Sequence, residues 1–370
     1  MGIMEYRAVP RGGAQASVIG LGMGSIHAGD DREIERTVAR ALEAGVNYFD
    51  LAPSEFRPFA PIGRALAARP REDVLVQMHF GAVYETGSER KYGWTLDADR
   101  IAAAFEEELE ILDVGYTDFG MVHCIDEERD FNQVMRGGTW DYLQRLKAQG
   151  TVRHIGASTH DPHIARLFLE TGLVDLIMFS VNPAYDGAQG AYGIGTAAAR
   201  AALYRDCEQA GVALSVMKAF AGGQLLDAAR SPLGQALTRA QLIQYALDRP
   251  AALTVLPGVR GLADLEEVLA FLDATPAERD WSKVTTLVPT NSEPTCVYCN
   301  HCLPCPAGID VGLVNKYYDL ARAGDEMARD HYTHLAVSAA DCRSCGHCNS
   351  RCPFGVAQEA RMQEIAAYFA

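Results

Sequence analysis

From about residue 14 to residue 272, short runs of apolar residues alternate with longer segments in which apolar and polar residues recur at a helical period. Continuous apolar runs are typical of strands buried on both faces, and amphipathic segments are typical of helices that cover a sheet. The pattern predicts strands at residues 16–22, 47–51, 74–79, 119–123, 152–158, 176–181, 213–218 and 253–257.

The segments between these strands have the pattern of helices, and most end near a glycine that can form a left-handed cap. They include residues 32–44, 98–112, 140–149, 163–170 and 263–272. Eight strand–helix units in succession predict an α/β fold, a (β/α)8 TIM barrel with parallel strands. A doubly wound open sheet has the same periodicity and is the alternative.

The composition changes after the last of these helices. Residues 274–292 are rich in proline, threonine and charge, and eight of the ten cysteines follow them. Residues 311–328 alternate apolar and charged positions like a helix. We therefore predict a barrel domain at 1–273, a linker at 274–292 and a small α-helical domain at 293–370.

The cysteines of this last region form two dense runs with the spacing C-x2-C-x2-C and a fourth cysteine before a proline. This spacing is typical of two-cluster ferredoxins, in which the fourth cysteine ligates the other cluster. It predicts two [4Fe–4S] clusters as cofactors in a ferredoxin-like domain. The ligands would be Cys296, Cys299, Cys302 and Cys352 for one cluster, and Cys342, Cys345, Cys348 and Cys305 for the other.

Structural zinc sites and disulfides are the two alternatives for these cysteines. Structural zinc sites usually present separated C-x2-C pairs, not trios. A disulfide scaffold needs an oxidising compartment, and nothing at the N-terminus resembles a secretion signal. We therefore predict a cytoplasmic protein.

Charge and hydropathy limit the classes of partner that are expected. The net charge of −15 argues against a general nucleic-acid surface, and no apolar run has the length of a membrane-spanning helix. The expected partner is a small-molecule substrate, with a redox partner protein as a further option.

Polar residues end several consecutive predicted strands. The catalytic residues of TIM barrels lie at the C-terminal ends of the strands, so these residues predict a pocket there. Three of them are histidines, which could also converge on a divalent metal ion. The residues are Asp50, His79, His123, Ser158, Thr159, His160 and Lys218.

Several motifs, in order and at suitable spacing, resemble the aldo/keto reductase barrel. They lie at residues 20–25, 47–50, 62–66, 121–123, 146–150, 155–158 and 257–258. Residues 179–186 and 216–223, with the cysteine runs, resemble the branch of that family that carries a C-terminal two-cluster ferredoxin domain.

The resemblance implies a mechanism in which NADPH passes hydride to a carbonyl and a tyrosine, tuned by a lysine and an aspartate, protonates the oxygen. It assigns Asp50 to the aspartate and His123 to the substrate-orienting histidine. The tyrosine position falls at Glu55 and the lysine position at His79. Imidazole titrates near neutral pH, so we expect His79 and His123 to supply the proton chemistry, and Glu55 only if burial raises its pKa.

The resemblance also locates the cofactor. Thr159, Met178 and Met217 replace the family's usual nicotinamide contacts, which predicts weak NADPH binding, and no flavin motif is present. Backbone N–H groups of glycines and a guanidinium can still meet phosphates; the candidates are Gly222, Gly223, Gly258 and Arg260. Arg57 is a candidate for pairing with a carboxylate substrate, beside Ser158, His160 and Lys218.

These features predict an iron–sulfur oxidoreductase that acts on a small organic substrate. One alternative is a non-redox lyase, isomerase or hydratase with His79 and His123 as its acid–base pair. Another is an electron-relay subunit with a non-catalytic barrel.

Overall fold

The computed structural model describes residues 2–84, 90–187, 194–286, 296, 302–322, 329, 332–352 and 355–370. The chain forms two compact units. The first comprises Met1–Gly190 with Gly195–Pro289, and the second comprises Ala191–Ile194 with Thr290–Ala370. The domain boundaries at residues 273 and 293 stay predictions.

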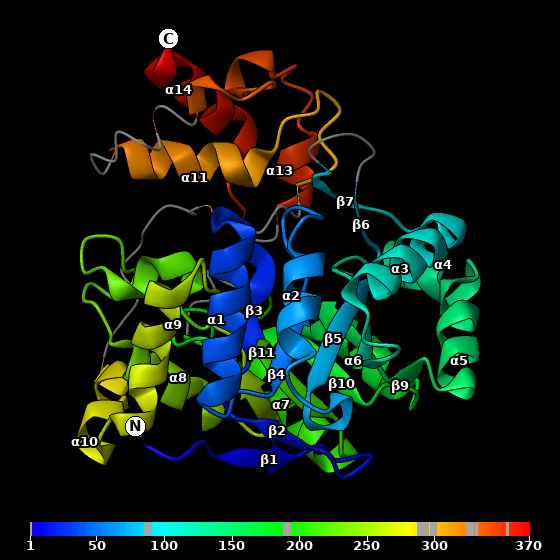
Figure 1. Ribbon diagram of the computed structural model, residues 1–370. Helices are drawn as coiled ribbons and strands as arrows, with labels where there is room; N and C mark the ends of the chain where they lie inside the picture. Colours follow the sequence, from blue (N-terminus) through cyan, green and yellow to red (C-terminus); the bar gives the residue numbers. More distant parts are fainter. Residues whose placement is uncertain are drawn as a thin grey trace. The chain divides into compact units, whose positions relative to one another are not determined.

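The first unit is a closed barrel of parallel strands (Figure 1). Parallel bridges from Ile19 to Val255 and from Gly22 to Gly258 join its first and last strands, which confirms the predicted barrel and rules out an open sheet. The strands, in order around the barrel, are β3 (Leu21–Gly22), β4 (Tyr48–Leu51), β5 (Leu75–Phe80), β8 (Thr117–Val122), β9 (Val152–Thr159), β10 (Leu176–Ser180), β11 (Ala213–Met217) and β12 (Ala252–Val255).

Helices surround the strands, as the amphipathic pattern predicts (Figure 1). The helix predicted at 98–112 has these same bounds, and its first turn is capped by Asp97, which accepts from the backbone N–H of Arg100 at 2.9 Å. The helices are α1 (Asp31–Glu43), α2 (Phe59–Leu66), α3 (Ala98–Leu112), α4 (Glu128–Arg136), α5 (Thr139–Gln149), α6 (Pro162–Glu170), α7 (Ala197–Ala210), α8 (Arg239–Leu247), α9 (Leu262–Leu269) and α10 (Pro276–Arg279).

The register of the strands places polar groups inside the barrel near its C-terminal end. Side chains of a strand alternate between its two faces, so Gln77 and His79 share the inward face of β5 with Leu75. In the neighbouring strand, Asp50 pairs in register with Gln77. Below these polar groups the interior is apolar and contains Tyr48, Leu75, Phe119, Met121, Leu176, Met178, Ala213 and Met217.

Two antiparallel hairpins were not predicted. One pairs β1 (Tyr6–Ala8) with β2 (Gln15–Ser17), so the predicted strand 16–22 is divided between this hairpin and β3. The other pairs β6 (Ala82–Tyr84) with β7 (Tyr92–Trp94). The backbone N–H of Tyr92 donates to the Ser54 carbonyl at 3.0 Å, which fixes β7 beside the loop that follows β4.

At the N-terminal end of β10, Asp175 holds together segments of the barrel wall. It accepts from Lys147 Nζ at 2.7 Å and lies 3.2 Å from His154 Nδ1. Burial acts to raise the pKa of Asp175, but these hydrogen bonds outweigh it and lower the pKa to about 2. The carboxylate therefore stabilises the folded state while it is ionised.

The described part of the second unit is helical, with α11 (Val311–Arg322), α13 (His347–Arg351) and α14 (Gln358–Phe369). Its core contains Ile309, Val314, Met362 and Ile365. The helix predicted at 311–328 ends at Arg322 in the described part, and residues 323–328 lie outside it. Among the described helices, none combines the length and apolar character needed to cross a bilayer.

Candidate active site

Four side chains form a continuous hydrogen-bonded series at the C-terminal end of the barrel. Asp50 Oδ1 lies 2.6 Å from His79 Nε2, and His79 Nδ1 lies 2.8 Å from His123 Nδ1. His123 Nε2 lies 2.7 Å from the hydroxyl oxygen of Tyr92. We call these four residues the proton chain; it joins a buried carboxylate to a phenol.

With Asp50 ionised and both imidazoles neutral, the three contacts are compatible with one direction for every proton in the proton chain. The ionised carboxylate of Asp50 only accepts, so Nε2 of His79 carries a proton and donates to it. In a neutral imidazole the other nitrogen then accepts, so His79 Nδ1 accepts from Nδ1 of His123, and His123 Nε2 accepts from Tyr92. All three protons point from Tyr92 toward Asp50.

Gln77 fixes the buried end of the chain. Its Nε2 donates to Asp50 Oδ1 at 2.6 Å, and its Oε1 accepts from the Tyr48 hydroxyl at 2.6 Å. Burial, followed by the nearby Asp50 charge, raises the pKa of Tyr48 well above its usual value, so Tyr48 remains a donor. Because Gln77, His79 and Asp50 are buried from water, these hydrogen bonds act in a low dielectric and hold one geometry.

Tyr92 is the outer member of the chain and was missed by sequence reasoning. Side chains of β7 alternate, so Tyr92 and Trp94 share a face, and Trp94 Nε1 donates to the carbonyl of His123 at 3.0 Å. Unlike the two histidines, Tyr92 is only half-buried. No periodic signal marked Tyr92 in the sequence, because β7 has only three residues.

Glu55 holds the position at which the resemblance places the family's tyrosine. Its backbone forms an antiparallel bridge with Lys91, the residue before Tyr92. The hairpin therefore brings the phenol of Tyr92 close in sequence pairing to Glu55, at which the resemblance places the family's tyrosine. No hydrogen bond links Glu55 to the proton chain among the described residues.

The other residues that were predicted to bind substrate are not members of the proton chain. Ser158 Oγ accepts from the backbone N–H of Cys124 at 2.8 Å, and His160 pairs with Asp126 at 3.2 Å. His160 is therefore not joined to His79 and His123, and the described residues include no group of three metal-ligating side chains. Lys218 has a left-handed φ of 59° directly after β11.

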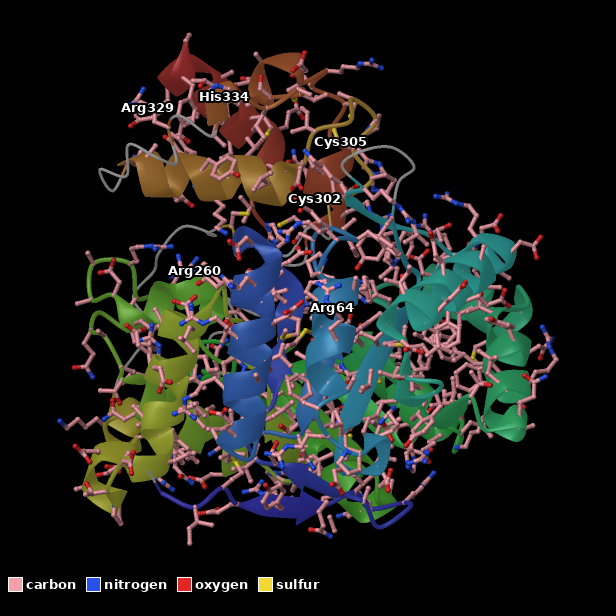
Figure 2. All side chains as sticks on the ribbon, in the orientation of Figure 1. Arg64, Arg260, Cys302, Cys305, Arg329 and His334 are labelled. Atoms are coloured by element: carbon pink, nitrogen blue, oxygen red, sulfur yellow. The ribbon has the colours of Figure 1, made fainter. Side chains whose placement is uncertain are left out.

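Arg57 and Arg260 are engaged by neighbouring carboxylates. Arg57 donates to Asp31 at 2.6 Å and to the carbonyl of Gly29 at 2.8 Å, and its role in binding a substrate stays a prediction. Arg260, labelled in Figure 2, donates to Asp264 at 2.7 and 2.9 Å.

The predicted phosphate-binding glycines lie in two turns after the last strands. Gly222 and Gly223 have φ of 64° and 87°, which only glycine adopts readily. The space in front of the Cα atoms of Gly223 and Gly258 is open to 4 Å. A phosphate can therefore approach the backbone at both turns.

The cysteines of the second unit differ in their surroundings. Cys305, Cys342, Cys345 and Cys348 line one small cavity, and Cys299 lies outside the described residues. Cys302 (labelled with Cys305 in Figure 2) and Cys348 belong to the apolar core.

The fold and the site define a parallel α/β barrel with a polar site at the C-terminal ends of its strands, and comparison with known proteins identifies its family. The sequence model of the Aldo/keto reductase family matches residues 18–241, and the chain belongs to this family.

Curated relatives match about half of the chain. It is 32% identical over 178 residues to an aldo-keto reductase of Mycolicibacterium smegmatis, covering 47% of this chain and 58% of the relative. It is 30% identical to L-galactose dehydrogenase of Arabidopsis thaliana, over 47% of this chain and 56% of the relative. It is 32% identical to NADH-specific methylglyoxal reductase of Escherichia coli, over 42% and 51%. The chain thus spans less than two thirds of the length of these relatives.

Solved structures share the fold at lower identity. An aldo-keto reductase from Bacillus halodurans superposes with a TM-score of 0.63 at 20% identity, covering 78% of this chain and 98% of that protein. A glycerol dehydrogenase from Gluconobacter oxydans gives 0.58 at 20% identity, covering 76% and 95%.

The prediction of two [4Fe–4S] clusters as cofactors is wrong. The described cysteines form no group of three metal-ligating side chains, and the matched family region ends at residue 241. Cys302 and Cys348 are buried among apolar side chains, where a thiol packs as a small apolar group, whereas Cys345 is exposed. The comparisons give no support to a ferredoxin domain, and one relative is named as NADH-specific.

Proposed function

We propose that the chain is an oxidoreductase that interconverts a small carbonyl compound and its alcohol, with Tyr92 exchanging the proton. The observation that carries this proposal is the proton chain from Tyr92 through His123 and His79 to Asp50. It supplies a phenol, and a path for its proton, in a barrel whose usual tyrosine position holds Glu55.

During alcohol oxidation, protons move along the proton chain from Tyr92 toward Asp50. A phenol oxygen can accept one proton while it donates another, so Tyr92 can act between the substrate and His123. As the substrate hydroxyl gives its proton to the Tyr92 oxygen, Tyr92 passes its own proton to His123 Nε2, and His123 passes its Nδ1 proton to His79. The positive charge then lies on His79, where Asp50 stabilises it at 2.6 Å.

Carbonyl reduction runs the same transfers in reverse. It begins with the additional proton on His79 and ends with that proton on the substrate oxygen. Asp50, His79 and His123 are positioning and relay groups in both directions, because His79 is buried and reaches the substrate only through its neighbours.

We propose a nicotinamide dinucleotide as the redox cofactor, which supplies or accepts the hydride when bound. The open backbone faces of Gly223 and Gly258 fit its phosphates. Met178 and Met217, which line the inner barrel, would contact the nicotinamide end through sulfur and methyl groups. The naming of an NADH-specific relative supports the choice of cofactor.

The substrate class we propose is a small aldehyde, ketone or sugar. The relatives named for methylglyoxal and L-galactose support this size. The test is the oxidation of NADH and of NADPH with methylglyoxal and related α-oxoaldehydes, followed by absorbance. Absence of turnover with every carbonyl in either direction would oppose an oxidoreductase and favour the non-redox alternative.

A further inference from the structure

Helix α3 carries a carboxylic acid in its buried stripe. Ile101, Phe105, Glu108 and Leu112 recur at helical spacing on the face that is buried. Glu108 is 2% exposed, although an apolar residue is expected at such a position. A carboxyl that loses its hydration here must be compensated by a partner or remain protonated.

Glu108 has no such partner among the described residues. Its Oε1 is buried without a hydrogen bond. The nearby groups are engaged elsewhere: both oxygens of Glu107 accept from Arg90 at 2.7 Å, and the Tyr84 hydroxyl donates to the carbonyl of Pro53 at 2.9 Å. Burial, with the Glu107 charge, raises the pKa of Glu108 well above its usual value.

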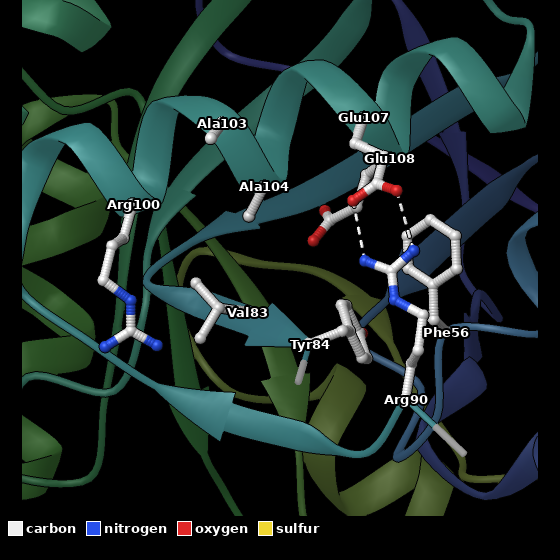
Figure 3. Close-up of a pocket in the computed structure, with 9 residues that line it drawn as sticks. All are labelled: Phe56, Val83, Tyr84, Arg90, Arg100, Ala103, Ala104, Glu107 and Glu108. Atoms are coloured by element: carbon white, nitrogen blue, oxygen red, sulfur yellow. Dashed lines mark hydrogen bonds and ion pairs between the residues drawn. The ribbon is translucent and has the colours of Figure 1, made fainter. Parts of the chain in front are cut away.

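The carboxyl of Glu108 points into a cavity of about 550 Å³ between α3 and β6 (Figure 3). This volume is in the usual range of small-molecule sites. Val83 and Tyr84 of β6 line one side of the cavity. On the α3 side, Ala103 and Ala104 are small and leave room along the helix.

An exposed cation lies at the other end of this cavity. Arg100 is exposed, and its guanidinium makes no hydrogen bond or ion pair with a described residue. Arg100 and Glu108 are eight positions apart on α3, which corresponds to about 12 Å along the helix axis. Figure 3 shows the two side chains at opposite ends, with the two alanines between them.

We propose that this cavity binds a linear ω-amino acid, with its ammonium group at Glu108 and its carboxylate at Arg100. An ammonium group supplies the opposite charge that an ionised buried carboxylate requires. The planar guanidinium of Arg100 matches a carboxylate. The methylene chain lies against Val83, Ala103 and Ala104. The site is separate from the proton chain and does not rest on the proposed reaction.

The test is calorimetric titration of the full chain with 6-aminohexanoate, hexanoate and hexylamine. We expect saturable binding of 6-aminohexanoate, weakened at least tenfold by Glu108→Gln and by Arg100→Gln. Binding of hexylamine should depend on Glu108 alone, and binding of hexanoate on Arg100 alone. Arg36→Gln, which changes an exposed arginine on α1, is the control and should leave all three affinities unchanged.

Two results would overturn the proposal. One is the absence of saturable 6-aminohexanoate binding to the unmodified chain. The other is an affinity for 6-aminohexanoate that neither Glu108→Gln nor Arg100→Gln lowers. If circular dichroism shows that Glu108→Gln is unfolded, the exposed Arg100→Gln variant decides: it must weaken 6-aminohexanoate and hexanoate, but not hexylamine.

Discussion

Replacement of Tyr92 by phenylalanine tests the proton chain most directly. The change removes one oxygen and keeps the ring that packs on His123 at a centroid distance of 5.7 Å. The lost hydrogen bond to His123 Nε2 should cost about 1 kcal/mol of stability. A positioned acid or base contributes about 10²–10⁴-fold to turnover. The loss of activity should therefore greatly exceed the loss of stability.

The assay compares initial rates of carbonyl reduction and alcohol oxidation in the Tyr92→Phe variant and the unmodified chain. Tyr142→Phe is a matched control, because its hydroxyl donates to Glu106 on α3 at 3.3 Å and not to a member of the proton chain. We expect that control to keep its turnover. Melting temperatures of both variants identify any loss caused by unfolding.

The two directions of the reaction provide a second measurement on the same variant. Because reduction and oxidation use the same proton transfers in opposite order, Tyr92→Phe should lower both rates by a similar factor. If Tyr92→Phe keeps more than half of the turnover in both directions, Tyr92 does not exchange the proton and the reasoning is refuted.

Other predictions follow from the same contacts. His79→Asn and His123→Asn should lower turnover by roughly 10²–10⁴-fold. Glu55→Gln should lower turnover less than tenfold, because Glu55 forms no hydrogen bond with the described members of the proton chain. Steady-state kinetics checks all three variants, and an inactive Glu55→Gln variant would reverse the assignment. Asp175→Asn should lower the free energy of unfolding by about 1–2 kcal/mol at neutral pH. Denaturant unfolding should show that this difference from the unmodified chain disappears as pH falls through about 4 toward 2, because the folded-state pKa of Asp175 is lowered to about 2. Because the pKa of Glu108 is raised, the folded state retains a proton that the unfolded state loses as pH rises above the ordinary carboxyl value of 4.5. The free energy of unfolding should therefore fall above this pH by up to about 1.4 kcal/mol per pH unit. Glu108→Gln should abolish this part of the pH dependence, and an unchanged pH dependence in the variant would argue against a buried acid.

The barrel and the strand-end residues could be predicted because they depend on local patterns. Asp50, His79 and His123 each lie at or directly after the end of a buried strand. Neighbouring parallel strands in a barrel bring these ends to one rim. The structure places the three side chains in direct contact, as this reasoning expects, although their catalytic role stays a proposal.

Tyr92 could not be found in the same way. The strand that carries it has three residues, too short for a period to be recognised, and its position depends on pairing with a loop more than thirty residues away. Gln77 was hidden for another reason, since it lies inside an apolar strand and faces inward. Long-range pairing, not composition, determines both.

The partners of charged residues could not be predicted, because a sequence does not show which opposite charge is nearest. Arg57 and Arg260 have the chemistry to meet a substrate or a phosphate, yet each already binds an aspartate. The cysteine runs show the same limit: their spacing matches a known pattern, but the described thiols do not form the corresponding site.

The β6–β7 hairpin has a consequence for regulation. Tyr84, which lines the cavity at Glu108, is paired in register with Tyr92 on the opposite strand. A molecule in the cavity that favours one position of the hairpin would shift the population in which Tyr92 contacts His123. Thermodynamic reciprocity then requires a substrate held by Tyr92 to change the affinity of that molecule by the same factor. Any coupling between the proposed cavity ligand and the proposed substrate would therefore run through one pair of strands, β6 and β7.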